Sequence, residues 1–235
     1  MTESCLYHVS FDTLPYLEAF QLQERAVELQ RQGLFPDLLL TLEHPPTVTV
    51  GVSGSLADLN VSESFLRSQG INVVQTNRGG KITYHGPGQL VIYPLLDLRT
   101  LKLPPRKYLS LLEEITIEIL SEWGVQSSRR DDRPGVWVED RKIASIGIRL
   151  RAGRTMHGLA VNLNTDLTPF SYFAPCGMPE VVTTSLHREC NQPIEREQVR
   201  QRFAQKLAER LGVDLEELSR SDRRFLSCLN RDFWD

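Results

Sequence analysis

The sequence has no long apolar run and few cysteines. No stretch of about 18 consecutive apolar residues occurs, so a membrane-spanning helix is not expected. The N-terminal segment 1–11 lacks the basic start and apolar core of a secretory signal. The four cysteines are too widely spaced for a disulfide framework or a CxxC metal site, and His187 with Cys190 lacks a second ligand pair. These absences favour a soluble cytoplasmic protein with no metal, no cofactor and no contact with the membrane. The four cysteines are Cys5, Cys176, Cys190 and Cys228.

Charge is distributed unevenly along the chain. The 235 residues carry a net charge of −3, yet residues 129–154 hold eight basic side chains against four acidic ones. This stretch is either an ordinary solvated face or a docking surface for an acidic partner. Nucleic acid is not expected as a partner, because the basic residues are not interleaved with stacking aromatics.

Apolar periodicity predicts a single α/β domain over residues 1–235, of the α+β type. Helices with apolar residues at steps of three or four are expected at 14–32, after Pro104-Pro105 up to Trp123, and after Pro193 up to Leu211, with glycine after each. Strands are expected at 38–42, 47–50, 71–75, 90–96, 136–139, 142–150 and 155–164. Asp140-Arg141 and Gly153 are the predicted turns between the last three strands. Strands mixed with flanking helices indicate a large, mixed, partly antiparallel sheet.

Cys176 lies in the segment Pro175-Cys-Gly-Met-Pro179, which excludes regular secondary structure. A buried inert thiol is the more common fate of such a cysteine. A nucleophilic role requires a neighbour that stabilises the thiolate, because the thiol form reacts poorly.

Lys142 is the candidate for that neighbour. Strand alternation places it on the same face as Ala144, Ile146 and Ile148, so that its amino group points to the apolar side of the sheet. A desolvated lysine can serve as base and acid near neutral pH, and its charged form favours a thiolate. The alternative is a strand-end lysine that pairs with Glu139 or Asp140, or extends to solvent.

Residues 78–89 form the densest glycine cluster of the chain. The cluster fails the P-loop pattern, since Ile82 follows Lys81, and it fails G-x-G-x-x-G, since Val91 replaces the third glycine. The cluster is therefore either a loop whose backbone approaches a ligand closely or a simple glycine-rich hairpin.

Glycine also interrupts two predicted neighbouring strands, at Gly147 and Gly158. Glycine within a strand often marks a close approach by another group. The two gaps could line one slot for an aliphatic chain, although two ordinary bulges would give the same pattern. His157 alternates with apolar residues and is expected to point inward in a supporting role.

Taken in order, several motifs resemble the lipoyl(octanoyl) transferase family of lipoate biosynthesis. The matching stretches are Leu42-Glu-His-Pro-Pro46, Arg78-Gly-Gly-x-x-Thr-Tyr-His-Gly-Pro-Gly-Gln89, Gly135-Val-Trp137, Lys142-Ile-Ala-Ser-Ile-Gly147, His157-Gly-Leu-Ala160 with Asn162, Pro175-Cys-Gly177 and Thr184-Ser-Leu186. The resemblance implies a fold similar to the biotin and lipoate protein ligase catalytic domains.

The same resemblance implies a site and a reaction. Cys176 would carry the acyl group as a thioester, and Lys142 would lower the pKa of its thiol and move protons. The implied donor is octanoyl-acyl carrier protein, and the implied acceptors are lysines of lipoyl domains in 2-oxoacid dehydrogenase complexes and of the glycine cleavage H protein. The implied substrate-binding residues are Arg78, Gly79, Gly80, Lys81, Ile82, Thr83, Tyr84, His85, Ser145, Ile146, Gly147, Gly158, Leu159 and Ala160. Three alternatives remain at this point: an ATP-dependent lipoate or biotin ligase, a cysteine-dependent thioesterase and a non-catalytic binding module.

Overall fold

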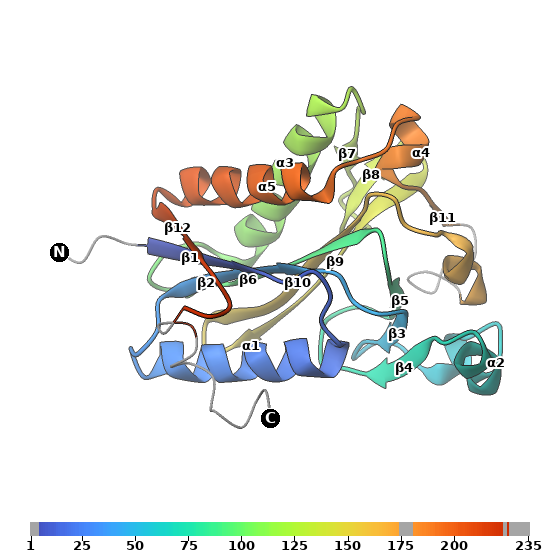
Figure 1. Cartoon of the computed structure of the whole chain (residues 1–235), viewed down its shortest axis with the longest axis horizontal. Coiled ribbons are helices and arrows are strands. Elements are labelled where there is room, and N and C mark those ends of the chain that lie inside the picture. Colours follow the sequence, from blue (N-terminus) through green and yellow to red (C-terminus); the bar gives the residue numbers. More distant parts are fainter. Residues whose placement is uncertain (1–4, 174–180, 223–224, 226–235) are drawn as a thin grey trace.

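A mixed sheet runs through the centre of the protein, and the computed structural model describes it within residues 5–173, 181–222 and 225. Within these residues the sheet has nine strands, in the order β12-β1-β2-β6-β10-β9-β8-β7, with β11 beside β9 (Figure 1). The β12–β1, β1–β2 and β9–β11 pairs are parallel, and the other pairs are antiparallel. The strands are β1 (Cys5–Ser10), β2 (Asp37–Leu42), β6 (Gln89–Leu95), β7 (Ser128–Arg129), β8 (Val136–Val138), β9 (Arg141–Arg151), β10 (Arg154–Asn162), β11 (Val182–Thr183) and β12 (Asp214–Leu218).

Helices cover both faces of this sheet. Helix α1 (Tyr16–Arg31) lies on one face, while α3 (Pro105–Glu122) and α5 (Arg196–Leu211) lie on the other (Figure 1). Each face has its own apolar core, built around Leu22 on the α1 side and around Leu112 and Phe203 on the α3 and α5 side. In the part of the chain described here, no helix combines the length and apolar character that crossing a membrane would need.

A smaller sheet lies beside one end of the central sheet. Its strand order is β4-β3-β5, and it packs with α2 and η2 around buried residues such as Val48, Leu66 and Phe170 (Figure 1). The bounds of these elements and the remaining short helices are β3 (Thr47–Val50), η1 (Leu56–Asp58), α2 (Glu63–Ser68), β4 (Asn72–Gln75), β5 (Ile82–His85), η2 (Thr168–Tyr172) and α4 (Leu186–Cys190).

The fold class predicted from the sequence is confirmed, with differences at the edges. The three long helices and the seven predicted strands are present within one or two residues of their predicted bounds. The turn before β9 falls at Glu139 and Asp140, one residue earlier than predicted, because Glu139 adopts a left-handed conformation (φ 50°). Strands β1, β5, β7, β11 and β12 were not predicted.

The glycine-rich stretch 78–89 is neither a plain loop nor a hairpin. It contains β5, which pairs with β3 of the small sheet, and then turns into β6 of the central sheet. Residues 78–89 therefore join the two sheets, and the hairpin interpretation is wrong, because the two strands flanking Gly86–Gly88 pair with different partners.

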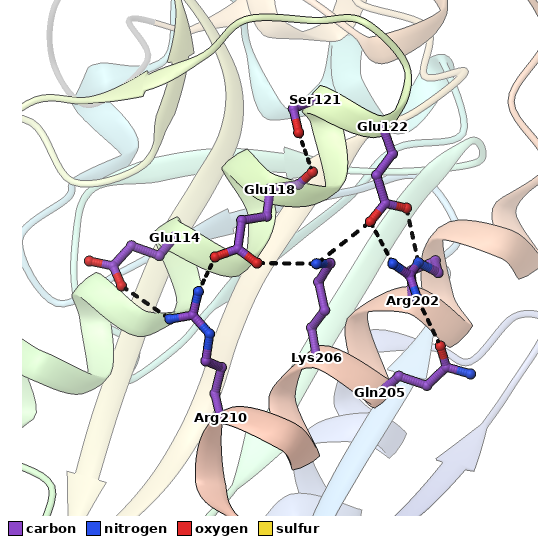
Figure 2. A network of polar contacts seen from close by, with 8 residues as sticks. All are labelled: Glu114, Glu118, Ser121, Glu122, Arg202, Gln205, Lys206 and Arg210. Atoms are coloured by element: carbon purple, nitrogen blue, oxygen red, sulfur yellow. Dashed lines mark hydrogen bonds and ion pairs between the residues drawn. The ribbon is translucent and has the colours of Figure 1, made fainter.

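An ion-pair network joins α3 to α5 on the outer surface. Arg210, Lys206 and Arg202 of α5 face Glu114, Glu118 and Glu122 of α3 (Figure 2). Lys206 bridges two carboxylates, with its Nζ 3.1 Å from Glu118 and 3.6 Å from Glu122. Because exposed pairs each contribute little, the buried contacts of Phe203 and Leu207 supply most of the packing energy of α5.

Asp37, at the start of β2, is half-buried, and its surroundings disfavour the charged form of its carboxyl group. Burial, and then the nearby carboxylate of Asp97, raise the pKa of Asp37 to about 6, although the Asp97 N–H donates to it and Arg154 lies near. A folded-state pKa above the unfolded value means that stability is highest when Asp37 is protonated and falls as pH rises from about 4 to 6. Asp37→Asn is therefore expected to raise the free energy of unfolding by about 1–3 kcal/mol at pH 7.5 and to change it little at pH 4. Urea titrations at the two pH values measure this, and equal stability of the two proteins at pH 7.5 would contradict it.

Candidate functional site

A cavity opens between the two sheets and is lined mainly by three segments that are distant in sequence. Most of the predicted substrate-binding residues border it, from the 78–85 segment, from β9 and from β10. Its empty volume is about 530 Å³, a figure that includes the open solvent at its mouth. The lining residues are Tyr16, Arg78, Gly80, Lys81, Ile82, Thr83, His85, Tyr93, Lys142, Ser145, Ile146, Gly147, His157, Gly158, Leu159 and Ala160.

Two of the predicted residues do not border this cavity. Gly79 lines a neighbouring hollow, and its N–H donates to the Ile148 carbonyl at 3.0 Å. Tyr84 is buried in the core of the small sheet, where its ring packs against Phe170. Thr83 and His85, which do border the cavity, lie on the opposite face of β5 from Tyr84.

Arg78 fixes the loop that forms one wall of the cavity. Its guanidinium is buried and donates to the Thr49 carbonyl at 2.7 Å, to the Thr49 hydroxyl at 2.8 Å and to the Lys81 carbonyl at 2.9 Å. The loop is further held by backbone bonds, such as Gly51 N–H to the Lys81 carbonyl at 2.8 Å. Arg78 thus holds the wall in shape and also places a positive charge beside the cavity.

Lys142 lies near the start of β9 and is 95% buried, with 5% of its surface exposed. Its Nζ lies 5.2 Å from the centre of the buried Trp137 ring, a favourable position for a cation. Glu139 and Asp140, the alternative partners considered from the sequence, pair with Arg141 and Arg130. The burial agrees with the expected inward orientation and disagrees with a lysine that extends to solvent.

The Lys142 side chain packs against a backbone segment that has no room for another atom. Gly135 has φ +128°, and a Cβ there would lie 2.5 Å from the Ala144 carbonyl oxygen and 2.7 Å from Lys142 Cε. The Gly135 N–H donates to the buried Glu113 carboxylate on α3 at 2.8 Å. Burial raises the pKa of Glu113, while the Gly135 N–H and the charges of Arg129 and Lys142 oppose the rise. Glu113 therefore anchors the segment that positions Lys142.

A chain of buried hydrogen bonds connects the cavity to the backbone of Lys142. His85 Nδ1 lies 2.8 Å from Gln89 Oε1, and Gln89 Nε2 donates to Asn162 Oδ1 at 2.9 Å. Asn162 Nδ2 donates to the Thr184 carbonyl at 3.0 Å, and the Thr184 N–H donates to the Lys142 carbonyl at 2.9 Å. Because Gln89 Oε1 is an acceptor, His85 carries its proton on Nδ1.

The aromatic and imidazole groups around the cavity are uncharged at neutral pH. Burial lowers the pKa of His44 to about 4 and of His157 to about 3, and it places the pKa of His85 well below its usual value. Burial likewise raises the pKa of Tyr93 far above its usual value, and His44 Nε2 lies 2.8 Å from the Tyr93 hydroxyl. The histidines therefore act as neutral hydrogen-bonding groups in this wall.

His157 points inward as expected, with 1% of its surface exposed, and it has φ +58°. Its ring stacks on Phe20, and its Nε2 lies 2.8 Å from Asn77 Oδ1. This left-handed residue precedes the point where β10 begins to pair with β6, at Leu159 and Ile92.

Gly147 and Gly158 lie directly opposite each other on β9 and β10, and both border the cavity. A Cβ on Gly147 would lie 2.8 Å from the Gly79 carbonyl oxygen, and a Cβ on Gly158 would lie 2.1 Å from the Ile92 carbonyl oxygen. Backbone atoms of other segments therefore occupy the space that a side chain at either glycine would need. The glycines let the 78–81 loop and β6 approach closely, and the cavity forms beside them.

The basic stretch 129–154 is largely neutralised by carboxylates elsewhere in the chain. Ion pairs join Arg129 to Glu114, Arg141 to Glu189, Arg151 to Glu24 and Arg154 to Asp97. These pairs favour the solvated-face interpretation for most of the stretch.

Cys176, the predicted nucleophile, lies outside the described residues. The flanking segments end at Phe173, which is buried, and resume at Val181, which precedes β11 beside β9. Val182 and Thr183 of β11 pair with Arg141 and Lys142.

Sequence reasoning missed Tyr16 and Tyr93, which also border the cavity. Tyr16 begins α1, and burial raises its pKa although its hydroxyl bonds Thr76 at 2.8 Å. In the sequence, Tyr16 lies within a predicted helix and Tyr93 within a predicted strand, and neither stands out from the apolar residues around it. A tyrosine in an otherwise aliphatic stretch, with a hydroxyl that needs a partner when buried, was the available signal.

Solved structures with the same architecture define the class of this domain. The bi-partite lipoate protein ligase of Thermoplasma acidophilum superposes with a TM-score of 0.72 at 16% identity, over 97% of this chain and 92% of that one. A lipoate-protein ligase A bound with ATP gives 0.71 at 17% identity, over 96% and 93%. At such identities the likeness shows the fold alone, a catalytic domain of the lipoate and biotin protein ligase type.

Sequence similarity identifies the family, which the structural similarity alone does not. Residues 15–208 match the lipoyl protein ligase A/B catalytic domain, and the chain belongs to this family. It is 42% identical over 207 residues to an octanoyltransferase of Desulfotalea psychrophila, covering 87% of this chain and 93% of the relative. It is 40% identical over 188 residues to a mitochondrial octanoyltransferase of Arabidopsis thaliana, covering 80% of each. The protein is an acyltransferase, so the family resemblance seen in the sequence is confirmed.

Proposed function

We propose that the protein transfers an octanoyl group from acyl carrier protein to a lysine of a lipoyl domain, through a thioester on Cys176. The observation that carries this proposal is that Lys142 is buried and borders the cavity. The chain that holds it is 42% identical to an octanoyltransferase. The acceptors are lipoyl domains of 2-oxoacid dehydrogenase complexes and the glycine cleavage H protein.

In the first half-reaction, the Cys176 sulfur attacks the donor carbonyl. Lys142 takes the thiol proton and delivers it to the departing carrier thiol, so that one thioester replaces another at little free-energy change. The acyl chain lies in the cavity against Ile146, Leu159 and Ala160, while Arg78 holds the facing loop.

In the second half-reaction, the acceptor amine attacks the Cys176 thioester. Lys142 removes a proton from the amine and returns it to the Cys176 sulfur, leaving an amide on the acceptor. The reaction from thioester to amide is downhill and needs no ATP. Backbone N–H groups near Gly80 or Cys176 would stabilise the tetrahedral oxyanion.

Transfer in the absence of ATP tests this function. The purified protein, octanoyl-acyl carrier protein and a lipoyl domain are mixed without nucleotide, and the mass of the lipoyl domain is measured. We expect a gain of one octanoyl group on the domain. Gain only with ATP and free octanoate would indicate a ligase, and free octanoate released without domain modification would indicate a thioesterase.

A further inference from the structure

A second hollow meets the cavity at Lys142. It shares Gly80, Lys81, Lys142, Ile146 and Gly147 with the cavity, and it then continues outward between α3 and β9. A thioester that reacts at Lys142 has two arms, one on each side of its carbonyl. Two adjoining hollows that share Lys142 offer one place for each arm.

The outer hollow differs in chemistry from the inner cavity. Leu109 of α3, Pro134 and Ile148 form an apolar floor, and the side chains of Leu109 and Ile148 are half-buried. Three basic side chains border it, those of Lys81, Arg133 and Lys142, against one carboxylate, that of Asp132. The outer hollow thus offers both apolar contact and a net positive charge.

Arg133 is placed to bind an anion at this border. Its side chain is 29% exposed, and its Nε lies 3.1 Å from Asp132, whose carboxylate is 72% exposed. Among the described residues, the two terminal guanidinium nitrogens have no hydrogen-bond partner within the chain. The Arg133 carbonyl accepts the indole N–H of Trp137 at 3.1 Å, which ties its backbone to the ring beside Lys142.

We propose that the outer hollow receives the phosphopantetheine arm of the acyl carrier protein, with Arg133 pairing with its phosphate. This inference rests on the proposed function, since it assigns the second arm of the same donor. The octanoyl chain enters the inner cavity, the amide-bearing arm lies over Leu109 and Pro134, and the phosphate reaches the guanidinium. After the carrier thiol leaves, the same opening admits the acceptor lysine, which carries no phosphate.

Donors with and without the phosphate test the assignment. Acylation of the enzyme is followed with octanoyl-acyl carrier protein and with octanoyl-pantetheine, which lacks the phosphate. For Arg133→Ala we expect kcat/KM to fall about 10- to 100-fold with the carrier protein, mainly through KM, and less than about threefold with octanoyl-pantetheine. Arg133→Lys should recover part of the loss, and transfer from preformed acyl-enzyme to a lipoyl domain should keep its rate.

Arg129→Ala is the matched control, because Arg129 belongs to the same basic stretch but pairs with Glu114 away from the hollow. Equal losses with both donors, no loss with either, or the same effect in Arg129→Ala would overturn the assignment of the arm. Failure of the wild-type protein to be acylated by either donor would instead overturn the proposed function.

Discussion

Lys142→Ala is expected to lower the rate of octanoyl transfer by about 100- to 10,000-fold, because in the proposed mechanism its amino group moves protons in both half-reactions. Lys142 is buried, and it packs against the Trp137 ring and the Gly135 backbone. Single-turnover kinetics with octanoyl-acyl carrier protein measure the first half-reaction separately from the second.

Lys142→Arg separates charge from proton transfer. Arginine keeps the positive charge at position 142 but cannot be deprotonated. We expect the arginine variant to remain as impaired as the alanine variant in turnover, although its cysteine should still react with a small alkylating reagent faster than that of Lys142→Ala. Turnover within about tenfold of wild type in Lys142→Ala would refute the proton-transfer role.

Gly135→Ala is expected to lower turnover by about 100-fold, although it replaces none of the reacting side chains. The new Cβ would meet Lys142 Cε at 2.7 Å and the Ala144 carbonyl oxygen at 2.5 Å, so the lysine must move. Misplacement of a catalytic group by about 1 Å commonly costs on the order of 100-fold in rate. Turnover and thermal unfolding are measured on the same preparation.

Gly33→Ala is the matched control for Gly135→Ala. Gly33 also has a positive φ, of +71°, but a Cβ there would meet nothing within 4 Å. The control should lose some stability and retain its turnover. If Gly135→Ala keeps full turnover while folded, the close packing of this glycine against Lys142 has no role in catalysis.

The central fold could be predicted because its elements have strong local signals. The β9–β10 hairpin is an example, since two alternating apolar runs flank Gly153, and the turn residues Ala152 and Gly153 both have positive φ. Helix α5 likewise shows its apolar face at Val199, Phe203 and Leu207 and ends at Gly212 in a left-handed conformation.

Edge strands such as β12 could not be predicted, because their residues do not alternate regularly between apolar and polar. Strand β12 has the sequence Asp-Leu-Glu-Glu-Leu and becomes a strand only by pairing with β1, more than 200 residues away in the chain. Such pairing depends on tertiary context, which local propensity does not contain.

The sequence could indicate which residues border the cavity, but not how these residues are arranged in space. Motifs placed Arg78, Lys142 and Gly158 in one set, and the structure brings all three to one cavity. The pairing of β5 with the small sheet, which turns Tyr84 away, depends on long-range contacts. The role of Glu113 was hidden for the same reason, because it acts on Gly135 from a helix 22 residues earlier in the sequence.

The acyl-thioester on Cys176 is the central claim, and intact-mass measurement tests it most directly. Wild-type protein is incubated with octanoyl-acyl carrier protein without ATP or acceptor, and Cys176→Ser is treated in parallel. We predict one added octanoyl group on the wild type, removable by hydroxylamine and located at Cys176 by peptide fragmentation, and none on Cys176→Ser. An unmodified wild-type protein that still octanoylates lipoyl domains, or an adduct that persists in Cys176→Ser, would contradict the account.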